Sequence, residues 1–207
     1  AARHFCQVSH DFVWQVAFSP DSRWLAIASY GGRVTLWDVH QQQIAGNLVQ
    51  PAQANAPSLA FSPDVSTLAA AGNDGAIHLW QVPSLQPAGP DLNGNGTSTT
   101  RLVYSPDGDL LISGDYEDSL YRTWNVRDGS PQGTPVDTGQ NGITDLAVSP
   151  DSARLYSAGN DGSVIEWDLA ERTTIGAELE IDGSAVESIS LSQDGATLAA
   201  GTYDGLV

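Results

Sequence analysis

Acidic side chains are the groups of this sequence with the clearest capacity for metal chemistry. Two acid-rich stretches stand out, one with Asp107 and Asp109 and the other with Asp115, Glu117 and Asp118. Carboxylate oxygens are the ligands that Ca²⁺ prefers, but neither stretch has the length and fixed alternation of a known calcium loop. Asp is also common in turns, because its side chain bonds nearby backbone amides. We therefore assign these acids to turns and predict no metal site.

The short motifs that mark common catalytic and cofactor sites are missing from the sequence. A phosphate-binding P-loop requires a lysine, which the chain lacks, and the patterns G-x-S-x-G, H-E-x-x-H and C-x-x-C do not occur. The histidines fall at unrelated positions and suggest no ligand cluster: His4, His10, His40 and His78. We predict that the chain is not an enzyme and binds no cofactor.

The charge of the chain restricts its partners. It contains 25 acidic residues against 8 basic ones, and its formal net charge is −17. The arginines are scattered singly, so no basic patch can neutralise phosphates, and direct nucleic-acid binding is not expected. The acidic, lysine-free composition also resembles that of proteins from salt-loving organisms.

Three features bear on the compartment of the chain. No run of 18 or more apolar residues occurs, and the first ten residues lack the basic start and apolar stretch of a signal peptide. The single cysteine, Cys6, cannot form a disulfide within the chain, which is compatible with a reducing compartment. We expect no membrane span in this segment and a cytoplasmic location.

Two markers recur along the chain with one period. The starts of Ser-Pro-Asp, and of one related Ser-Gln-Asp, are separated by 43, 43, 44 and 43 residues: Ser19, Ser62, Ser105, Ser149 and Ser192. Tryptophans recur at steps of 43, 44 and 43 residues: Trp37, Trp80, Trp124 and Trp167. Because independent markers keep the same spacing, the sequence is an internal repeat throughout.

Each period has the pattern of four strands. An apolar run ends at the Ser-Pro-Asp turn (strand a), a second run follows (strand b), a further turn leads to the tryptophan-bearing run (strand c), and a looser segment reaches the next period (strand d). In residues 157–169 we predict that Asp161 and Gly162 both take the positive φ angles of a tight hairpin turn. Small residues in strand b, such as 69–71, favour close packing near a central axis.

These repeats resemble the WD-repeat β-propeller family, which has four-stranded antiparallel blades and a Trp-Asp pair. The resemblance rests on Trp37-Asp38 and Trp167-Asp168, on the degenerate pairs that begin at Trp80 and Trp124, and on turn acids between strands b and c: Asp74, Asp118, Asp161 and Asp204. It implies an all-β propeller segment. A related group of propellers shares the Ser-Pro-Asp turn, but is not expected to show tryptophan at this spacing.

The resemblance also implies a buried relay in each blade, in which a histidine before strand a joins the turn Asp, a hydroxyl of strand b and the Trp. The histidine position, ten residues before each Ser-Pro-Asp or its relative, holds other residues: Ser9, Ala52, Asn95, Gly139 and Asp182. The fourth period keeps Ser157, Asp161 and Trp167, whereas Gly31 replaces the turn acid in the first. We expect the turn acids to bond turn amides and nearby hydroxyls instead.

The repeat divides the chain into blades at approximately 9–50, 51–92, 93–137 and 138–181, followed by an incomplete fifth blade at 182–207. Residues 3–8 have the pattern of a strand d from a preceding blade. Since family members commonly have about seven blades, we expect that the remaining blades of the same chain are missing here. The alternative is closure at five blades, with residues 3–8 completing the last one.

The resemblance implies a noncatalytic scaffold that binds partner proteins, or a sensor arm joined to a signalling ATPase or kinase. The alternative is a propeller enzyme or cofactor-binding propeller with a central small-molecule site. In the family, the b–c turns and the connections before strand a share one face. Aromatic residues precede the turn in alternate blades, and we predict partner anchors there: Tyr30, Tyr116 and Tyr203, with Phe12 and Glu117 beside them. Alternatively, each tyrosine ring covers its own loop.

Overall fold

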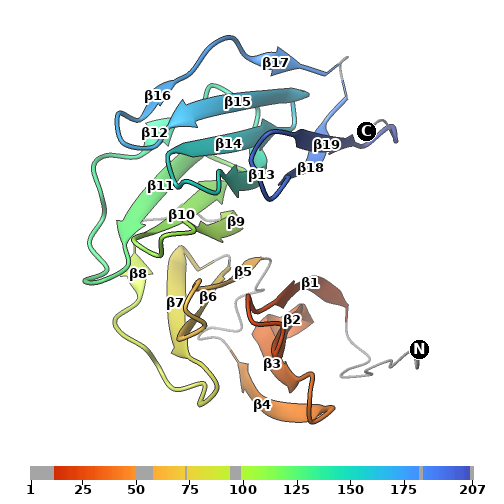
Figure 1. The fold of residues 1–207 in the computed structure, drawn as a ribbon, viewed down its shortest axis with the longest axis vertical. Helices are drawn as coiled ribbons and strands as arrows, with labels where there is room; N and C mark the ends of the chain where they lie inside the picture. Colours follow the sequence, from red (N-terminus) through yellow and green to blue (C-terminus); the bar gives the residue numbers. More distant parts are fainter. Residues whose placement is uncertain (1–11, 50–57, 73, 94–98, 182–183, 206–207) are drawn as a thin grey trace.

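The computed structural model describes residues 12–49, 58–72, 74–93, 99–181 and 184–205. Five antiparallel sheets follow one another around an arc, from blade 1 in red and orange to blade 5 in dark blue (Figure 1). In these ranges the helical structure is confined to a three-residue 3₁₀ turn, η1 (Tyr30–Gly32). The all-β prediction is therefore confirmed. The predicted strand at residues 3–8 lies outside the described residues.

The strands of each blade pair in sequence order. Blade 1 contains β1 Val13–Phe18, β2 Trp24–Ser29, β3 Arg33–Asp38 and β4 Gln43–Val49, and blade 2 contains β5 Ser58–Phe61, β6 Thr67–Ala71, β7 Ala76–Gln81 and β8 Leu92–Asn93. Blade 3 contains β9 Thr99–Tyr104, β10 Leu110–Asp115, β11 Leu120–Asn125 and β12 Val136–Asp137. Blade 4 contains β13 Ile143–Val148, β14 Arg154–Gly159, β15 Ser163–Asp168, β16 Thr173–Thr174 and β17 Leu179–Glu180, and blade 5 contains β18 Val186–Leu191 and β19 Leu198–Thr202. In blade 4, the fourth position is divided between β16 and β17, which both pair with β15.

The Ser-Pro-Asp turn has a local physical cause. In blade 1, Ser19 Oγ donates to Asp21 Oδ1 at 2.5 Å and accepts a hydrogen bond from Trp24 N at 2.9 Å. The same pair of bonds recurs in the other four blades, with the serine side chain closing the turn onto the first residue of strand b or its neighbour. Side-chain bonds of this kind replace backbone pairing at a turn, and so keep the residue types fixed from blade to blade.

The turn between strands b and c of blade 4 differs from the prediction. Gly162 has a φ of 89°, but Asp161 does not take a positive φ. Gly162 N donates to Gly159 O at 3.2 Å, so the left-handed residue follows the turn instead of forming its centre. The prediction that both residues are left-handed is wrong. The carboxylate of Asp161 instead accepts hydrogen bonds from Ser163 N, next to the turn, and from Asn141 N of the connection before β13.

Apolar packing between neighbouring blades forms the core. Between blades 1 and 2, Leu59 and Phe61 of blade 2 pack in one cluster with Trp24 and Ala26 of blade 1. Comparable clusters join blades 2 and 3, blades 3 and 4, and blades 4 and 5. Alanines of strand b in blades 1 and 2 pack in these clusters with large side chains of the next blade, whereas Ile112 takes this place in blade 3.

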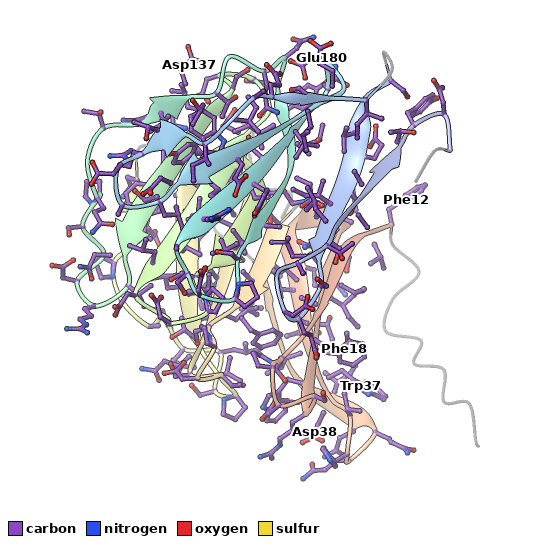
Figure 2. All side chains as sticks on the ribbon, turned by 45° about the horizontal axis from the view of Figure 1, so that its top comes forward. Phe12, Phe18, Trp37, Asp38, Asp137 and Glu180 are labelled. Carbon is purple, nitrogen blue, oxygen red and sulfur yellow. The ribbon has the colours of Figure 1, made fainter. Side chains whose placement is uncertain are left out.

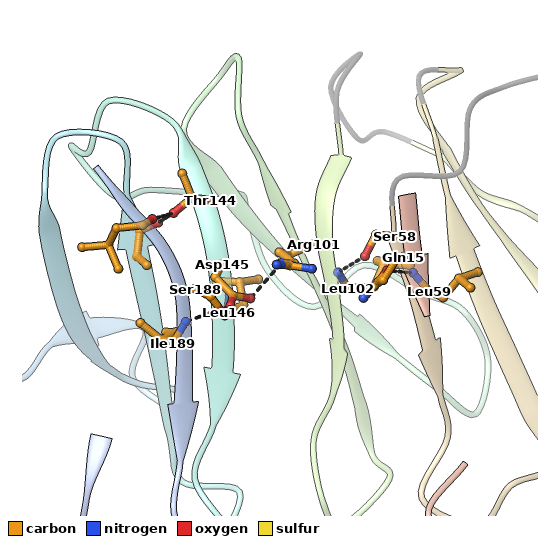
Figure 3. Close-up of polar contacts among 12 residues, drawn as sticks. Gln15, Ser58, Leu59, Arg101, Leu102, Thr144, Asp145, Leu146, Ser188 and Ile189 are labelled. Carbon is orange, nitrogen blue, oxygen red and sulfur yellow. Dashed lines mark hydrogen bonds and ion pairs between the residues drawn. The ribbon is translucent and has the colours of Figure 1, made fainter. Parts of the chain in front are cut away.

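A second set of contacts joins the innermost strands β1, β5, β9, β13 and β18. Side chains four residues before each Ser-Pro-Asp bond the next blade: Gln15 Oε1 accepts from Leu59 N at 2.6 Å, and Ser58 Oγ accepts from Leu102 N at 2.8 Å. Arg101 of β9 and Asp145 of β13 continue this row (Figure 3). The described residues show no ladder between blade 5 and blade 1, so closure at five blades is not shown.

Candidate functional site

The first predicted anchor, Tyr30, lies in η1 at the b–c turn of blade 1. Its backbone N donates to Phe12 O at 2.8 Å, which places Phe12 beside the turn. The ring of Tyr30 is 61% exposed and that of Phe12 is 83% exposed. Figure 2 shows Phe12 at one end of blade 1, with Phe18 toward the other. Two aromatic side chains therefore lie uncovered at the b–c end of this blade.

Tyr116, the second predicted anchor, packs against the neighbouring blade. Gly142, in the connection before β13, has a φ of +84°, and a methyl group on it would lie 2.7 Å from Tyr116 O and 3.0 Å from its ring. Tyr116 is 42% exposed. Its ring thus packs on the connection between blades 3 and 4, while part of it faces solvent.

Tyr203, the third predicted anchor, is the most exposed of the three at 79%. It follows β19, and its backbone N donates to Ala185 O at 3.0 Å, so the turn is fixed although the ring is open. Glu117 is exposed beside Tyr116, and its N donates to Asp115 Oδ1 at 2.8 Å. The two acid-rich stretches form turns, as the sequence predicts, because Asp107 likewise bonds its own turn at Ser105 and Asp109.

A buried relay holds the b–c turn of blade 4. Trp167 Nε1 donates to Ser157 Oγ at 2.9 Å, and Ser157 Oγ donates to Gln140 Oε1 at 2.7 Å. Gln140 Nε2 donates to Ser163 Oγ at 2.9 Å, and Ser163 Oγ donates to Asp161 Oδ1 at 2.6 Å. Gln140 is 4% exposed. A glutamine therefore stands where the resemblance implies a histidine, one residue later than the predicted position.

Hydrogen bonds also set the charge of the relay acid. Burial acts to raise the pKa of Asp161, but hydrogen bonds from Ser163 Oγ and from Asn141 N outweigh it, so the pKa lies below its ordinary value. The expectation that this acid bonds turn amides and hydroxyls is confirmed. Because Asn141 belongs to the connection before β13, Asp161 ties two loops of the same face together.

Blades 2 and 3 hold their turn acids with cations of strand c. His78 Nε2 lies 2.9 Å from Asp74 Oδ2, and His78 Nδ1 lies 2.8 Å from Asp91 Oδ1. At the equivalent place in blade 3, Arg122 Nη2 lies 2.5 Å from Asp118 Oδ2. Asp74 and Asp118 also accept backbone bonds from their turns. Both acids therefore bond amides of their turns, as expected, but the expectation did not include their main partners, His78 and Arg122.

The signature pair Trp-Asp serves the opposite turn. Asp38 Oδ1 accepts from Gln41 N at 2.8 Å, and Asp168 Oδ1 accepts from Ala170 N and Glu171 N at 2.9 and 2.8 Å. Asn125 substitutes in blade 3, where its Oδ1 accepts from Arg127 N at 2.9 Å. The residue after the tryptophan therefore caps the turn between strands c and d, which explains why Asn can replace Asp at this position.

A comparison with protein families agrees with this architecture. The model described as WD domain, G-beta repeat matches residues 4–38, 52–81, 132–168 and 177–207, which together make up more than half of the sequence. The chain belongs to the WD-repeat family. The match omits most of blade 3, although its sheet has the same four strands. No curated protein sequence matches the chain significantly.

Members of this family generally mediate interactions between proteins. No helix in the described part of the chain is long and apolar enough to cross a membrane. Sequence reasoning missed three residues that position the b–c turns, namely Gln140, His78 and Arg122. Each is a polar residue, and Gln140 lies one position after the place where the resemblance implies a histidine.

Proposed function

We propose that this chain is a noncatalytic protein-binding module and that its partner docks on the face formed by the b–c turns. The observation that carries the proposal is the exposure of Tyr30 and Tyr203, the most open tyrosines of that face. Tyrosine combines a large apolar area with a hydroxyl group at a low entropic cost, which makes it a frequent interface anchor. Phe12 adjoins Tyr30 and extends the apolar contact.

The charge of this face supports a partner with basic side chains. Exposed carboxylates lie in the b–c turns or at the neighbouring ends of the outer strands: Asp91, Glu117, Asp137, Glu180 and Asp204. Figure 2 shows Asp137 and Glu180 at the same end of the molecule. Arg33 is the exposed base next to Tyr30. Such a field favours encounter with a cationic surface and fixes orientation, while the aromatic rings supply affinity.

The contacts of the inner strands favour a scaffold over a central catalytic site. A propeller enzyme needs converging basic and acidic groups near its axis, and Arg101 and Asp145 are such groups. They bond each other and the next blade, with Arg101 Nε 2.8 Å from Asp145 Oδ1. Their polar atoms thus hold blades together, which suits a rigid platform for loops. We further propose that this platform is part of a longer cytoplasmic signalling or regulatory protein.

Site-specific photocrosslinking tests the proposed face. A photoreactive amino acid is placed at Tyr30 or at Tyr203, with a control at Asp128, an exposed residue after strand c near the opposite face. A partner of this face forms adducts from the first two positions and not from the control. Equal adducts from all three positions, or adducts from Asp128 alone, contradict the proposal.

A further inference from the structure

Blade 3 has a cleft on its outer side, where its fourth strand is interrupted. A bridge joins Trp124 to Pro131 and pairing with β11 resumes at β12, but residues 133–135 between them belong to no strand. Figure 1 shows the segment between β11 and β12 along the outer edge of the arc. The cleft has a volume of about 300 Å³, at the lower end of the range for small-molecule sites. We call it the blade 3 cleft, and it has a buried floor, a half-buried cation, two prolines and one residue of blade 2: Thr123, Trp124, Arg122, Pro131, Pro135 and Asn93.

Arg122 brings an incompletely bonded cation to this cleft. Its Nη2 lies 2.5 Å from Asp118 Oδ2, and its side chain is 11% exposed. In the part of the chain that the structure describes, its Nε is buried and has no hydrogen-bond partner. A guanidinium has more N–H donors than one carboxylate can accept, and a buried donor without an acceptor costs free energy. An acceptor in the cleft would therefore meet a cation that has a donor to spare.

Blade 2 shows which groups surround a cation at this place. His78 holds in blade 2 the position of Arg122 in blade 3, two residues before the tryptophan of the repeat. It contacts two carboxylates: its Nε2 lies 2.9 Å from Asp74 Oδ2, and its Nδ1 lies 2.8 Å from Asp91 Oδ1. Asp91 directly precedes β8, which pairs with β7 in the same register as β12 with β11. The strand c cation of this repeat can therefore hold two carboxylates at once.

Blade 3 supplies only one of these two carboxylates at the equivalent positions. Asp118 corresponds to Asp74, but Pro135 occupies the position of Asp91, eleven residues after the tryptophan. This proline and the guanidinium of Arg122 line the same cleft. The cleft lies between two complete four-stranded blades, 2 and 3. Its place in the fold is therefore the one that a carboxylate of the chain itself occupies in blade 2.

We propose that the blade 3 cleft binds a small carboxylic acid with an apolar body, whose carboxylate pairs with Arg122. The carboxylate occupies the position that the side chain of Asp91 has in blade 2, and a charge-assisted bond to a half-buried guanidinium is stronger than a neutral one. The apolar body packs on Pro131, Pro135 and Trp124. A free organic acid and the last residue of a protein chain both offer this chemistry.

Isothermal titration of the whole chain with phenylacetate tests the site, with phenylacetamide as the uncharged probe. Phenylacetate should bind with a dissociation constant of about 1 mM, because the probe is small and the net charge of −17 opposes anions. Phenylacetamide should bind at least about 10-fold more weakly, and so should phenylacetate with the variant Arg122→Gln. Equal binding of acid and amide overturns the proposal, and so does the absence of phenylacetate binding at about 10 mM.

A short peptide that ends in phenylalanine distinguishes the two sources of the carboxylate. With a free C-terminus it should bind more tightly than phenylacetate if the ligand is a chain end, and its amidated form should not bind. If phenylacetate binds and neither form of the peptide does, the ligand is a free acid. Equal binding of the free and the amidated peptide means that the carboxylate is not recognised, and overturns the proposal.

The variant Pro135→Asp reproduces the arrangement of blade 2 and tests the geometry without a ligand. Its carboxylate should pair with Arg122 and block phenylacetate. It should also melt about 2 °C or more above Pro135→Asn, which loses the same proline but stays neutral. In the Arg122→Gln background this difference should vanish. Equal melting temperatures of Pro135→Asp and Pro135→Asn overturn the proposal, and so does a difference that persists without Arg122. If circular dichroism shows that Arg122→Gln is unfolded, Pro135→Asp replaces it in the titration.

Discussion

Arg101 Nε lies 2.8 Å from Asp145 Oδ1, and this ion pair joins the innermost strands of blades 3 and 4. The other carboxylate oxygen of Asp145 accepts hydrogen bonds from Ser188 Oγ and Ile189 N of blade 5, both at 2.9 Å. One buried side chain therefore binds three consecutive blades (Figure 3). Because the apolar packing between blades is not directional, this carboxylate, like the other hydrogen bonds of the innermost strands, fixes their relative register.

Replacing Asp145 with Ala should lower the free energy of unfolding by about 3 kcal/mol, since it leaves Arg101 and the buried amide of Ile189 without their acceptor. Urea denaturation measures the change. Arg127→Ala is the control, because it breaks an exposed pair with Asp109 and should change stability by less than about 0.5 kcal/mol. Equal effects of the two substitutions would mean that Asp145 does not link the blades.

Gln140→Leu should lower the free energy of unfolding by about 1–3 kcal/mol, because it leaves the hydroxyls of Ser157 and Ser163 buried without their amide partner. Asp161→Ala, at the end of the same relay, should cost about 1–2 kcal/mol. The double variant should lose less than the sum, with a coupling of at least about 0.5 kcal/mol. Strict additivity would show that the relay is not one unit.

The bonds of His78 predict a pH-dependent stability. Burial alone lowers the pKa of His78, but hydrogen bonds to Asp74 and Asp91 outweigh it, and the pKa is raised above its ordinary 6.5. Both ring nitrogens face carboxylates, an arrangement that favours the charged, doubly protonated ring. Its stabilising effect is therefore complete below pH 6.5 and is lost as the pH rises through the raised folded-state pKa.

Unfolding of the wild type and of His78→Gln between about pH 6 and pH 9 measures this effect. The advantage of the wild type should shrink as the pH rises. His40→Gln, which changes an exposed histidine after β3, serves as the control and should show no such trend. An advantage that stays constant or grows toward pH 9 would rule out a charged His78.

Tyr116 and Tyr203 should differ in how much their removal lowers the melting temperature. Tyr116→Ala should lower the melting temperature by several degrees, because the ring packs on Gly142 of the next blade. Tyr203→Ala should leave it nearly unchanged, since that ring is 79% exposed. Differential scanning calorimetry compares the two. A larger loss for Tyr203→Ala would show that this ring packs on its own loop and is not free for a partner.

The sequence predicts those parts of the fold that depend on local bonds. Ser19 and Asp21 close a turn within six residues, so their spacing alone reveals the turn in every repeat. The pair Arg101 and Asp145 joins strands that are a full repeat apart, and both residues occupy one repeat position, which is uncharged in the other three blades. Such a contact can be recognised only from the packing of neighbouring blades in the structure.

Prediction of the candidate site is limited in the same way, by contacts between blades. The alternation of Tyr30, Tyr116 and Tyr203 follows from the repeat, but their different exposure depends on the neighbouring blade. Gln140 was missed because a count of ten residues before Ser-Pro-Asp ends on Gly139, and a one-residue shift in a loop changes which side chain turns inward. His78 lies in strand c, where a repeat alone does not show that it reaches a turn acid four residues earlier.

The proposed function depends most on the b–c turn face as the binding surface. The direct test is isothermal titration of a purified partner, identified by crosslinking at Tyr203, against the wild type and against Tyr30→Ala/Tyr203→Ala. The double variant should bind at least about 30-fold more weakly, as expected for interface anchors, with a melting temperature within about 2 °C of the wild type. An unchanged affinity, with or without a lower melting temperature, would contradict the proposed function.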